Sequence, residues 1–278
     1  MEKFFSVLIS VYHKENPLFL QKCLTSMVRQ SVLPFKIIVV KDGQLTPALA
    51  EVLESFQQTH PELFYITGYE TNLGLGKALQ FGLQFVETPW VARMDSDDIA
   101  VPIRFQQQIE FLKSHSEIDV LGCYLAEFES DENKTTRIKK VPVTHEEIYN
   151  VAHLFNPMNH MTVFMKTQSV LEAGGYKHAP FFEDYDLWIR MLAMGMKFHN
   201  LPLSLVLGRV GNDMVGKRHG LQYLRYEYQQ FQRMRALEFL TGFQYYKALT
   251  LRLPLRLLPK KILAALYNLA LRRKSTDD

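Results

Sequence analysis

The sequence is poor in cysteine and has no evident internal repeat. Its two cysteines, Cys23 and Cys123, stand far apart in apolar patterns without the spacing of metal ligands. They therefore predict buried free thiols in a reducing compartment, and not a disulfide scaffold or a zinc site. The apolar residues 4–12 run on into polar sequence with no small-residue cleavage site, so a signal peptide is not expected.

Long uncharged runs are missing from the basic C-terminal segment. Residues 239–278 carry eight Lys/Arg against two Asp, whereas the whole chain has a formal net charge of +3, so the remainder is mildly acidic. The longest uncharged run of this segment, 262–271, has ten residues, and a membrane-spanning helix needs ~20. The segment is therefore expected to meet an anionic surface without crossing a membrane, and the acidic remainder argues against nucleic-acid binding.

The chain does contain enough apolar sequence, 47% of 278 residues, to bury a large core. Short β-branched runs alternate with segments of helical periodicity, which is typical of an α/β fold with a mostly parallel central sheet flanked by helices. The expected strands are 4–12, 35–43, 62–69 and 90–94, and the expected helices are 17–31, 46–60 and 75–85. Ligands of such sheets bind at the carboxyl ends of the strands. Asp42, Asn72 and the acidic run 95–98 all fall there.

The acidic run ends an apolar strand. In "WVARMDSDDIAVP" (90–102), Asp95, Asp97 and Asp98 stand within four positions. Carboxylates clustered in this way can hold Mg²⁺ or Mn²⁺ that a phosphate-bearing substrate also coordinates. The alternative is that Asp97 or Asp98 caps the helix expected from Pro102. One aspartate is sufficient for a cap, so three favour the metal site.

The glycine-rich stretch "NLGLGKALQFG" (72–82) lacks the third glycine of a dinucleotide fingerprint, and no P-loop pattern surrounds Lys77. A nicotinamide site and a P-loop are therefore excluded. Two interpretations remain: a turn into a helix that brings Asn72 and Lys77 near a phosphate or ribose, or a turn with no binding role.

A second acidic group opens the helix expected in "APFFEDYDLWIRML" (179–192). Glu183, Asp184 and Asp186 would be favoured there by the helix dipole alone. The dipole does not explain the preceding Phe181 and Phe182, which would partly remove water from the carboxylates. A carboxylate beside apolar walls is a better proton acceptor, so the group is a candidate general base.

Five segments occur in a fixed order: "SVLISVY", "IIVVKDG", "NLGLGKAL", "RMDSDD" and "FFEDYDLWIRML". Together they resemble the family 2 glycosyltransferases of GT-A fold, in particular bacterial enzymes of O-antigen, capsule and exopolysaccharide synthesis. The resemblance covers roughly residues 4–220. It implies a metal-dependent, inverting transfer of a sugar from a nucleotide-diphosphate donor to a hydroxyl, with UDP-hexoses of the galactose or glucose type as favoured donors.

The resemblance also assigns roles at the acidic runs. Asp95 approaches the ribose or sugar of the donor, Asp97 ligates the Mn²⁺ or Mg²⁺ that bridges the diphosphate, and Asp98 supports them and is a candidate acceptor contact. Asp184 matches the general base, with Glu183 beside it.

Further donor contacts follow from the same resemblance. Tyr12 and Asp42 match the positions that hold the base, and Ser10 and Asn72 are counted with the donor-binding residues. Family members often have Ala-Arg-Asn where this chain has Ala78-Leu79-Gln80. A phosphate contact from that helix is therefore in doubt, and Lys77 is the substitute candidate.

Two later segments carry weaker candidates. "NPMNHMTVFMK" (156–166) resembles a segment that approaches the acceptor, where His160 either orients the acceptor or is a structural histidine. "LGRVGNDMVGKRHG" (207–220) combines glycines with cations and predicts a mobile loop in which Arg209 and Arg218 close over the diphosphate; the alternative is an exposed basic loop.

The C-terminal segment completes the predicted organisation, which is a catalytic domain at 1–220 and a helical, basic extension at 221–278. Leucines interleave with cations in 245–275, a pattern of segments that lie in a membrane interface. The alternative is packing on the catalytic domain or in a homodimer. The resemblance implies a lipid-diphosphate-linked saccharide acceptor, and hence a cytoplasmic protein peripherally attached to the inner face of the cell membrane.

Two other function classes remain open at this point. A phosphatase of the Asp-x-Asp type would use Asp95 as nucleophile and Asp97 as acid, but that motif normally opens its fold, and Ile99 stands where a hydroxylic or β-branched partner is expected. An inactive sugar-binding module is the third interpretation, and the retention of every acid argues against it.

Overall fold

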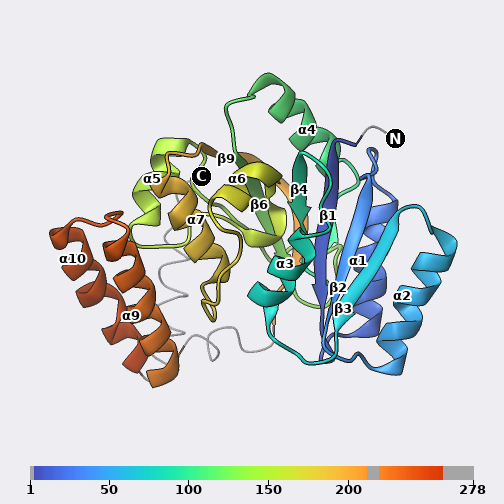
Figure 1. The fold of residues 1–278 in the computed structure, drawn as a ribbon, viewed down its shortest axis with the longest axis horizontal. Helices are drawn as coiled ribbons and strands as arrows, with labels where there is room; N and C mark the ends of the chain where they lie inside the picture. The colour runs from blue at the N-terminus through green and yellow to red at the C-terminus, as the bar shows by residue number, and fades with distance from the viewer. Residues whose placement is uncertain (1–2, 212–218, 259–278) are drawn as a thin grey trace. The chain divides into compact units, whose positions relative to one another are not determined.

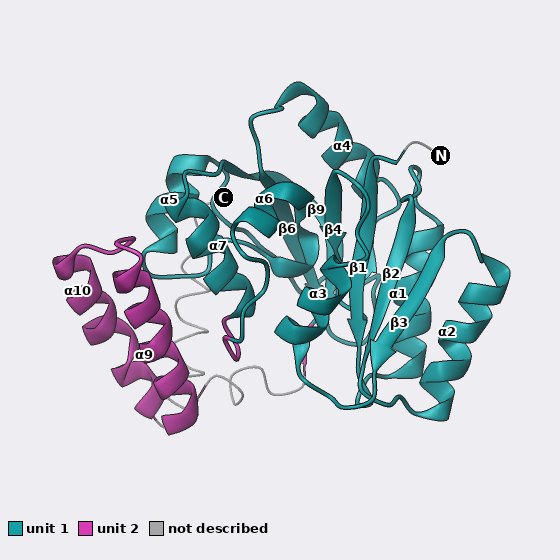
Figure 2. Cartoon of the chain, in the orientation of Figure 1, with its two compact units in different colours: residues 1–178, 183–209 teal, residues 179–182, 210–278 magenta. Residues whose placement is uncertain are grey.

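The computed structural model describes residues 3–211 and 219–258. The chain divides into two compact units (Figure 2). Unit 1 comprises Met1–His178 and Glu183–Arg209, and unit 2 comprises Ala179–Phe182 and Val210–Asp278.

Unit 1 is built on a sheet whose first half is parallel (Figure 1). Its strands are β1 (Phe5–Val11), β2 (Lys36–Asp42), β3 (Phe64–Tyr69) and β4 (Trp90–Arg93), in the spatial order β3-β2-β1-β4. Because β1 pairs in parallel with both β2 and β4, and β2 with β3, their carboxyl ends share one edge. The four expected strands and the expected edge are confirmed.

The second half of the sheet departs from the parallel arrangement. It contains β5 (Ile99–Ala100), β6 (Val120–Phe128), β7 (Arg137–Lys139), β8 (Phe164–Lys166) and β9 (Phe198–Arg209). Here β8 runs antiparallel to β4 and to β6, β7 to β6 and β5 to β9, and β6 pairs in parallel with β9. The sheet is therefore mixed.

Helices cover both faces of the sheet (Figure 1). α1 (Pro17–Val28) and α2 (Pro47–Thr59) begin as expected, since Asn16 and Thr46 cap them through their side chains and proline occupies the first turn. The other helices of unit 1 are α3 (Leu75–Leu83), α4 (Arg104–Ser114), α5 (His145–Ala152), α6 (Thr167–Glu172), α7 (Glu183–Ala193) and the 3₁₀ turn η1 (His160–Thr162).

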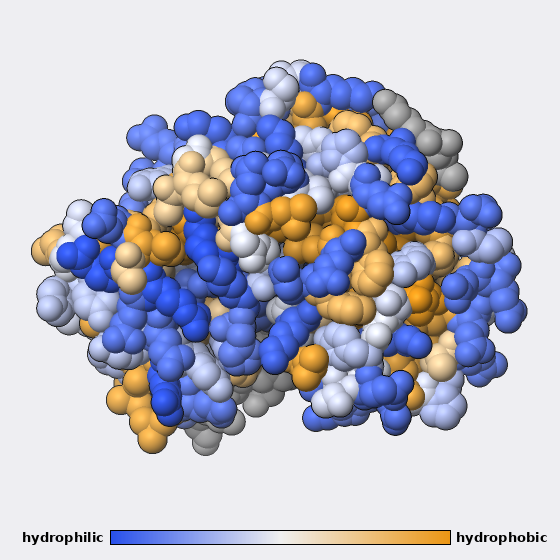
Figure 3. Space-filling view, in the orientation of Figure 1, coloured by the Kyte–Doolittle hydropathy of each residue, from blue (hydrophilic) through white to orange (hydrophobic). Residues whose placement is uncertain are grey.

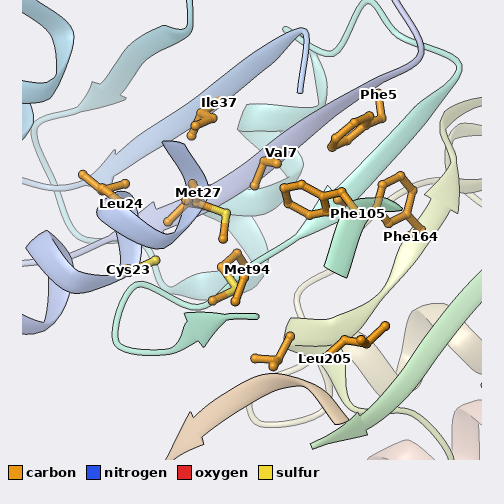
Figure 4. Close-up of a cluster of buried hydrophobic side chains, with 14 of the residues drawn as sticks. Phe5, Val7, Cys23, Leu24, Met27, Ile37, Met94, Phe105, Phe164 and Leu205 are labelled. Atoms are coloured by element: carbon orange, nitrogen blue, oxygen red, sulfur yellow. The ribbon is translucent and has the colours of Figure 1, made fainter. Parts of the chain in front are cut away.

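Successive side chains of β1 point to opposite faces of the sheet. Phe5, Val7, Ile9 and Val11 enter a large apolar cluster with residues of α1, α2 and α4. Figure 4 shows part of this cluster, in which Phe5 lies 4.8 Å from Phe105, ring centroid to ring centroid. Both cysteines are buried free thiols, as expected.

The opposite face of the sheet receives α3. Gly82 permits the close approach, because a Cβ there would lie 2.4 Å from Leu8 Cδ1 and 2.7 Å from Val40 Cγ2. α3 thus lies against β1 and β2 with its first turn at the carboxyl edge of the sheet.

Residues 219–258 of unit 2 are mostly helical. They contain α9 (Leu221–Ala236), α10 (Gly242–Arg252) and the 3₁₀ turn η2 (Pro254–Leu257). Glu227 of α9 is 1% exposed and accepts hydrogen bonds from Arg252 Nη2 at 2.6 Å and from Arg256 Nε at 2.6 Å. Two of the cations predicted to face an anionic surface therefore bind a carboxylate inside the protein. Among the described residues, no helix is both long and apolar enough to cross a membrane.

Candidate active site

The carboxyl edge of the parallel strands collects most of the candidate residues. Ser10 lies at the end of β1 and Tyr12 just after it, Asp42 ends β2, Asn72 follows β3 and the acidic run follows β4. The expectation that Asp42, Asn72 and the acidic run share one edge is therefore confirmed, although the roles of all these residues remain predictions.

The acidic run converges as a metal site requires. One ligand oxygen from each of Asp95, Asp97 and Asp98 lies within 4.8 Å of the others. Burial and repulsion from Asp95 raise the pKa of Asp97 to about 7. Burial, with repulsion from Asp95 and Asp97, also raises the pKa of Asp98 well above its usual range.

These residues fit a divalent cation. All the donors are carboxylate oxygens, which Mg²⁺ and Mn²⁺ prefer. Among the described residues, the buried Oδ2 of Asp98 has no hydrogen-bond partner, so it is an acceptor that a cation would satisfy. The capping alternative is wrong, because α4 begins after Ile103 and has no side-chain cap.

Arg93, at the end of β4, is a site residue that the sequence reasoning missed. Its side chain is 1% exposed and forms an ion pair with Asp95. Its Nε has no hydrogen-bond partner among the described residues. The same guanidinium lowers the pKa values of Asp97, Asp98, Glu183 and Asp184 below what their burial alone would give. The positive charge of Arg93 therefore stabilises the ionised carboxylates of both acidic groups.

A fourth carboxylate near the acidic run was also missed. Glu15 Oε2 accepts a hydrogen bond from Ser96 Oγ at 2.6 Å. Burial, Glu15 and Asp97 together raise the pKa of Tyr12, so Tyr12 lies close enough to the acidic run to sense its charge.

Arg209 does not lie in a mobile loop, and that prediction is corrected. It is the last residue of β9, with its guanidinium 3.7 Å from the ring centroid of Phe19 and 4.5 Å from that of Phe128. Its backbone N donates to Asp98 Oδ1 at 2.8 Å and its Nε to Asp97 O at 3.3 Å. Arg209 thus holds the acidic run in place. Arg218, the other cation proposed for this loop, lies outside the described residues.

Asp42 organises the turn before α3. Its 2% exposed side chain accepts hydrogen bonds from Tyr69 Oη at 2.9 Å, Leu73 N at 2.7 Å and Gly74 N at 3.0 Å. Asn72 Nδ2 also donates to it, at 3.1 Å. The observed contacts of Asp42 are therefore with this turn, and the base-binding role that the resemblance implies stays a prediction.

The first turn of α3 offers one exposed cation, Lys77. The Ala78-Leu79-Gln80 triplet does not reach the same surface, since Ala78 and Leu79 are buried. Gln80 Oε1 accepts from Tyr176 N at 2.7 Å. Lys77 therefore stays the candidate phosphate contact from this helix.

The second acidic group begins α7, as expected. Asp184 Oδ2 accepts from Asn156 Nδ2 at 2.7 Å, and its Oδ1 accepts from Tyr185 N at 2.7 Å. Burial raises the pKa of Asp184 despite these bonds. Burial and repulsion from Asp184 raise the pKa of Glu183 to about 7. A buried, oriented carboxylate of raised pKa can accept a proton near neutral pH.

The two acidic groups are neighbours across the sheet edge. Asp95 contributes to the raised pKa of Glu183. Gly76 in the first turn of α3 permits the approach of α7, because a Cβ at Gly76 would lie 3.1 Å from Glu183 Cβ. Further along α7, the buried pair Asp186 and Arg190 is joined at 2.9 Å, and Arg190 also donates to the carbonyl oxygens of Ala173 and Gly175. Asp186 therefore has a structural role.

The side chain of His160, in η1, contacts other side chains of the protein. Its Nε2 is 2.8 Å from Tyr176 Oη, and its ring centroid is 5.9 Å from that of Trp188. Burial lowers the pKa of His160 well below its usual range. These contacts favour the structural alternative over a contact with the acceptor.

Comparison with known proteins identifies close relatives of the whole chain. The family model "Glycosyl transferase family 2" matches residues 6–176. The amylovoran biosynthesis glycosyltransferase AmsE of Erwinia amylovora is 40% identical over 95% of this chain and 98% of its own length. The UDP-Gal:alpha-D-GlcNAc-diphosphoundecaprenol beta-1,3-galactosyltransferase of Escherichia coli is 31% identical over 97% of both chains.

Solved structures share the fold at lower identity. The mannosyltransferase PcManGT from Pyrobaculum calidifontis, in complex with GDP-Man and Mn²⁺, is 16% identical, with a TM-score of 0.62 over 96% of this chain and 80% of that one. This likeness supports the fold expected from the sequence, including a sheet flanked by helices.

Proposed function

Because the chain belongs to glycosyl transferase family 2, we propose that it transfers a hexose from a UDP-sugar to a hydroxyl of a lipid-diphosphate-linked saccharide in bacterial surface polysaccharide synthesis. One observation carries the proposal: two acidic groups of different character meet at one sheet edge. In the first group, carboxylate oxygens of Asp95, Asp97 and Asp98 lie close enough together to bind one cation. In the second group, a hydrogen bond orients the carboxylate of Asp184. A phosphatase would not require the second group.

The first group forms the donor site in this proposal. Asp95, Asp97 and the free oxygen of Asp98 would hold Mn²⁺ or Mg²⁺, which supplies positive charge where the leaving diphosphate develops negative charge. Arg93 keeps Asp95 oriented and Arg209 keeps Asp97 and Asp98 in place. Ser10 and Tyr12 offer polar groups at the same edge to the ribose and base.

The second group activates the acceptor. Asp184 removes the proton of the acceptor hydroxyl, whose oxygen then bonds to the anomeric carbon as the bond from that carbon to the diphosphate breaks. Attack from the face opposite the leaving group inverts the configuration. Asn156 and Tyr185 N fix both oxygens of Asp184. Burial raises the pKa of Asp184, which favours proton uptake by its carboxylate.

The choice of donor and acceptor rests on the relatives. The relative from Escherichia coli is a galactosyltransferase named for UDP-Gal and a diphosphoundecaprenol acceptor, and its similarity extends over 97% of this chain. AmsE belongs to the synthesis of a polysaccharide. We therefore favour a UDP-hexose and a lipid-linked acceptor, with the protein attached peripherally to the inner face of the cell membrane. The part of the predicted membrane segment at 259–278 lies outside the described residues.

A donor panel tests the proposal directly. The full-length protein is incubated with UDP-, GDP- and dTDP-hexoses and Mn²⁺, with and without a short-chain lipid-diphosphate acceptor, and the released nucleotide is measured. We expect slow hydrolysis of one UDP-hexose alone, and faster UDP release and a glycosylated acceptor when the acceptor is present.

Asp184→Asn is the variant to compare with the wild type, because asparagine has nearly the same shape as aspartate but cannot act as the base. It should lower kcat by ~10²–10⁴ while the affinity for UDP stays nearly unchanged. An equal loss of UDP affinity would make Asp184 a binding residue. Phosphate release from simple phosphomonoesters, without sugar transfer, would overturn the proposed function.

A further inference from the structure

The outward face of α10 exposes large apolar side chains beside Lys247 and Thr250. Phe243 is 78% exposed, Tyr246 68%, Leu251 50% and Leu257, in the following turn, 57%. Phe243 and Tyr246 are about one helical turn apart and lie on the same side of the helix, and Leu251 lies at the edge of the same exposed face. We call these four side chains the α10 stripe.

The inward side of the same helix carries a charged residue. Ala248, which is 1% exposed, and Arg252 lie toward α9, where Arg252 and Arg256 bind the buried Glu227. Burial alone would raise the pKa of Glu227, but hydrogen bonds from Arg256 and the charge of Arg252 lower it below its usual range. One of the two cations of α10, Arg252, is therefore directed into the protein, while large apolar side chains stay on the exposed face.

The three-residue cluster fixes this orientation. Glu227 accepts from Arg252 Nη2 at 2.6 Å and from Arg256 Nη2 at 2.8 Å. Turning the stripe inward would take both guanidinium groups away from a buried carboxylate, which is costly. The stripe is thus held at the surface, and Figure 3 shows hydrophobic side chains exposed on the helical unit among hydrophilic ones.

Charge indicates what the stripe contacts. Outside the Glu227 cluster, residues 219–258 contain four Lys/Arg and one Glu, and Lys247 stands on the exposed side of α10 between stripe residues. Aromatic side chains with neighbouring cations and few acids are typical of helices that lie at the surface of anionic membranes.

We propose that α10 lies in the interface of an anionic membrane, with Phe243 and Tyr246 inserted among the lipid headgroups. This inference deepens the proposed function, because it names the surface on which a lipid-linked acceptor would be held. It differs from the expectation drawn from 245–275, since it assigns the contact to described residues that begin at Phe243 and assigns Arg252 and Arg256 to the protein interior.

Point substitutions test the inference better than truncation does. Removing the chain after Glu238 would leave Glu227 buried without Arg252 and Arg256, so a loss of binding would not separate contact from folding. The double variant Phe243→Ser, Tyr246→Ser changes two exposed side chains and keeps the Glu227 cluster. Leu171→Ser, Leu203→Ser is the matched control, because these side chains of unit 1 are 48% and 44% exposed.

Full-length proteins are floated with vesicles of equal parts phosphatidylglycerol and phosphatidylcholine. We expect the wild type and the control to bind at low salt and to release as salt rises. The double variant should bind at least about tenfold more weakly than the wild type, because its two serines bury no aromatic surface in the membrane. Its thermal unfolding should match that of the wild type.

Three outcomes would overturn the inference: a wild type that ignores anionic vesicles, a double variant that binds like the wild type, or a lipid-free dimer of the wild type that the two substitutions dissociate. The last would assign the stripe to a second copy of the chain. Transfer to a water-soluble acceptor is measured in parallel and should be equal in all three proteins. Absence of transfer from the wild type would instead indicate failure of the proposed function, whatever the vesicles show.

Discussion

Removing the Asn156 amide should shift the pH dependence of sugar transfer. Asn156 Nδ2 donates to Asp184 Oδ2 at 2.7 Å, and this bond stabilises the ionised carboxylate. A hydrogen bond to a charged group contributes about 1.5–3 kcal/mol. Because Asn156 itself is exposed, the lower end of this range applies, which is about a tenfold change in an equilibrium constant. Asn156→Ala should therefore raise the Asp184 pKa.

The sign follows from the role of the base. Asp184 must be ionised to accept a proton, so a higher pKa moves the acid limb of the kcat profile to higher pH and slows transfer about tenfold on that limb. Burial already raises this pKa, while Tyr185 N, Arg93 and Lys139 lower it. All of these groups remain in the variant.

The assay is kcat against pH at saturating donor, with the donor KM measured at each pH. Asn150→Ala on α5 is the matched control, because its backbone oxygen and not its side chain is the group bonded to His153. The control profile should coincide with that of the wild type. An acid limb that does not move, or a donor KM that rises while kcat holds, would refute the assignment of Asn156 and Asp184 as positioning residue and base.

Three other changes have defined outcomes. Asp97→Ala should abolish Mn²⁺-dependent transfer without lowering the melting temperature, since it removes one of several carboxylates that repel each other; retained activity would exclude the metal site. Glu227→Gln should lower the free energy of unfolding by about 3–5 kcal/mol at pH 7. That loss should shrink once the pH falls through the lowered Glu227 pKa, where the wild-type carboxylate is protonated too. Gly82→Ala should cost about 1–3 kcal/mol in urea unfolding, because its Cβ would lie 2.4 Å from Leu8 Cδ1.

The parts of the fold that local chemistry determines could be predicted from the sequence. Thr46 followed by proline indicates a helix start, and Thr46 does cap α2 through its side chain. The first four strands and the two acidic groups follow from similar local patterns. The mixed half of the sheet could not be predicted, because the pairing of β6 with β8 and β9 joins segments far apart in sequence, and alternation does not say which strand is the neighbour.

The site residues divide along the same line. Gly208 suggested a mobile loop at Arg209, but it lies in β9, where a Cβ would come 2.8 Å from Leu125 Cδ2, so the glycine permits packing and not motion. Arg93 had a usable signal, since a single cation in a buried strand beside aspartates needs a partner. Asn156 had none, because its partner Asp184 is 28 residues away.

The turn that Asp42 holds, which the proposed function places at the donor site, has a consequence for how new donor specificities would arise. Donors from Tyr69, Leu73 and Gly74 already bond to that carboxylate, so the backbone path from β3 into α3 is set by folding and not by the incoming nucleotide. A preorganised wall loses little conformational entropy on binding. Evolution toward another sugar would then proceed by exchanging side chains on a constant backbone, first at exposed positions such as Leu73 and Lys77, while Asp42 stays under selection for the loop that it shapes.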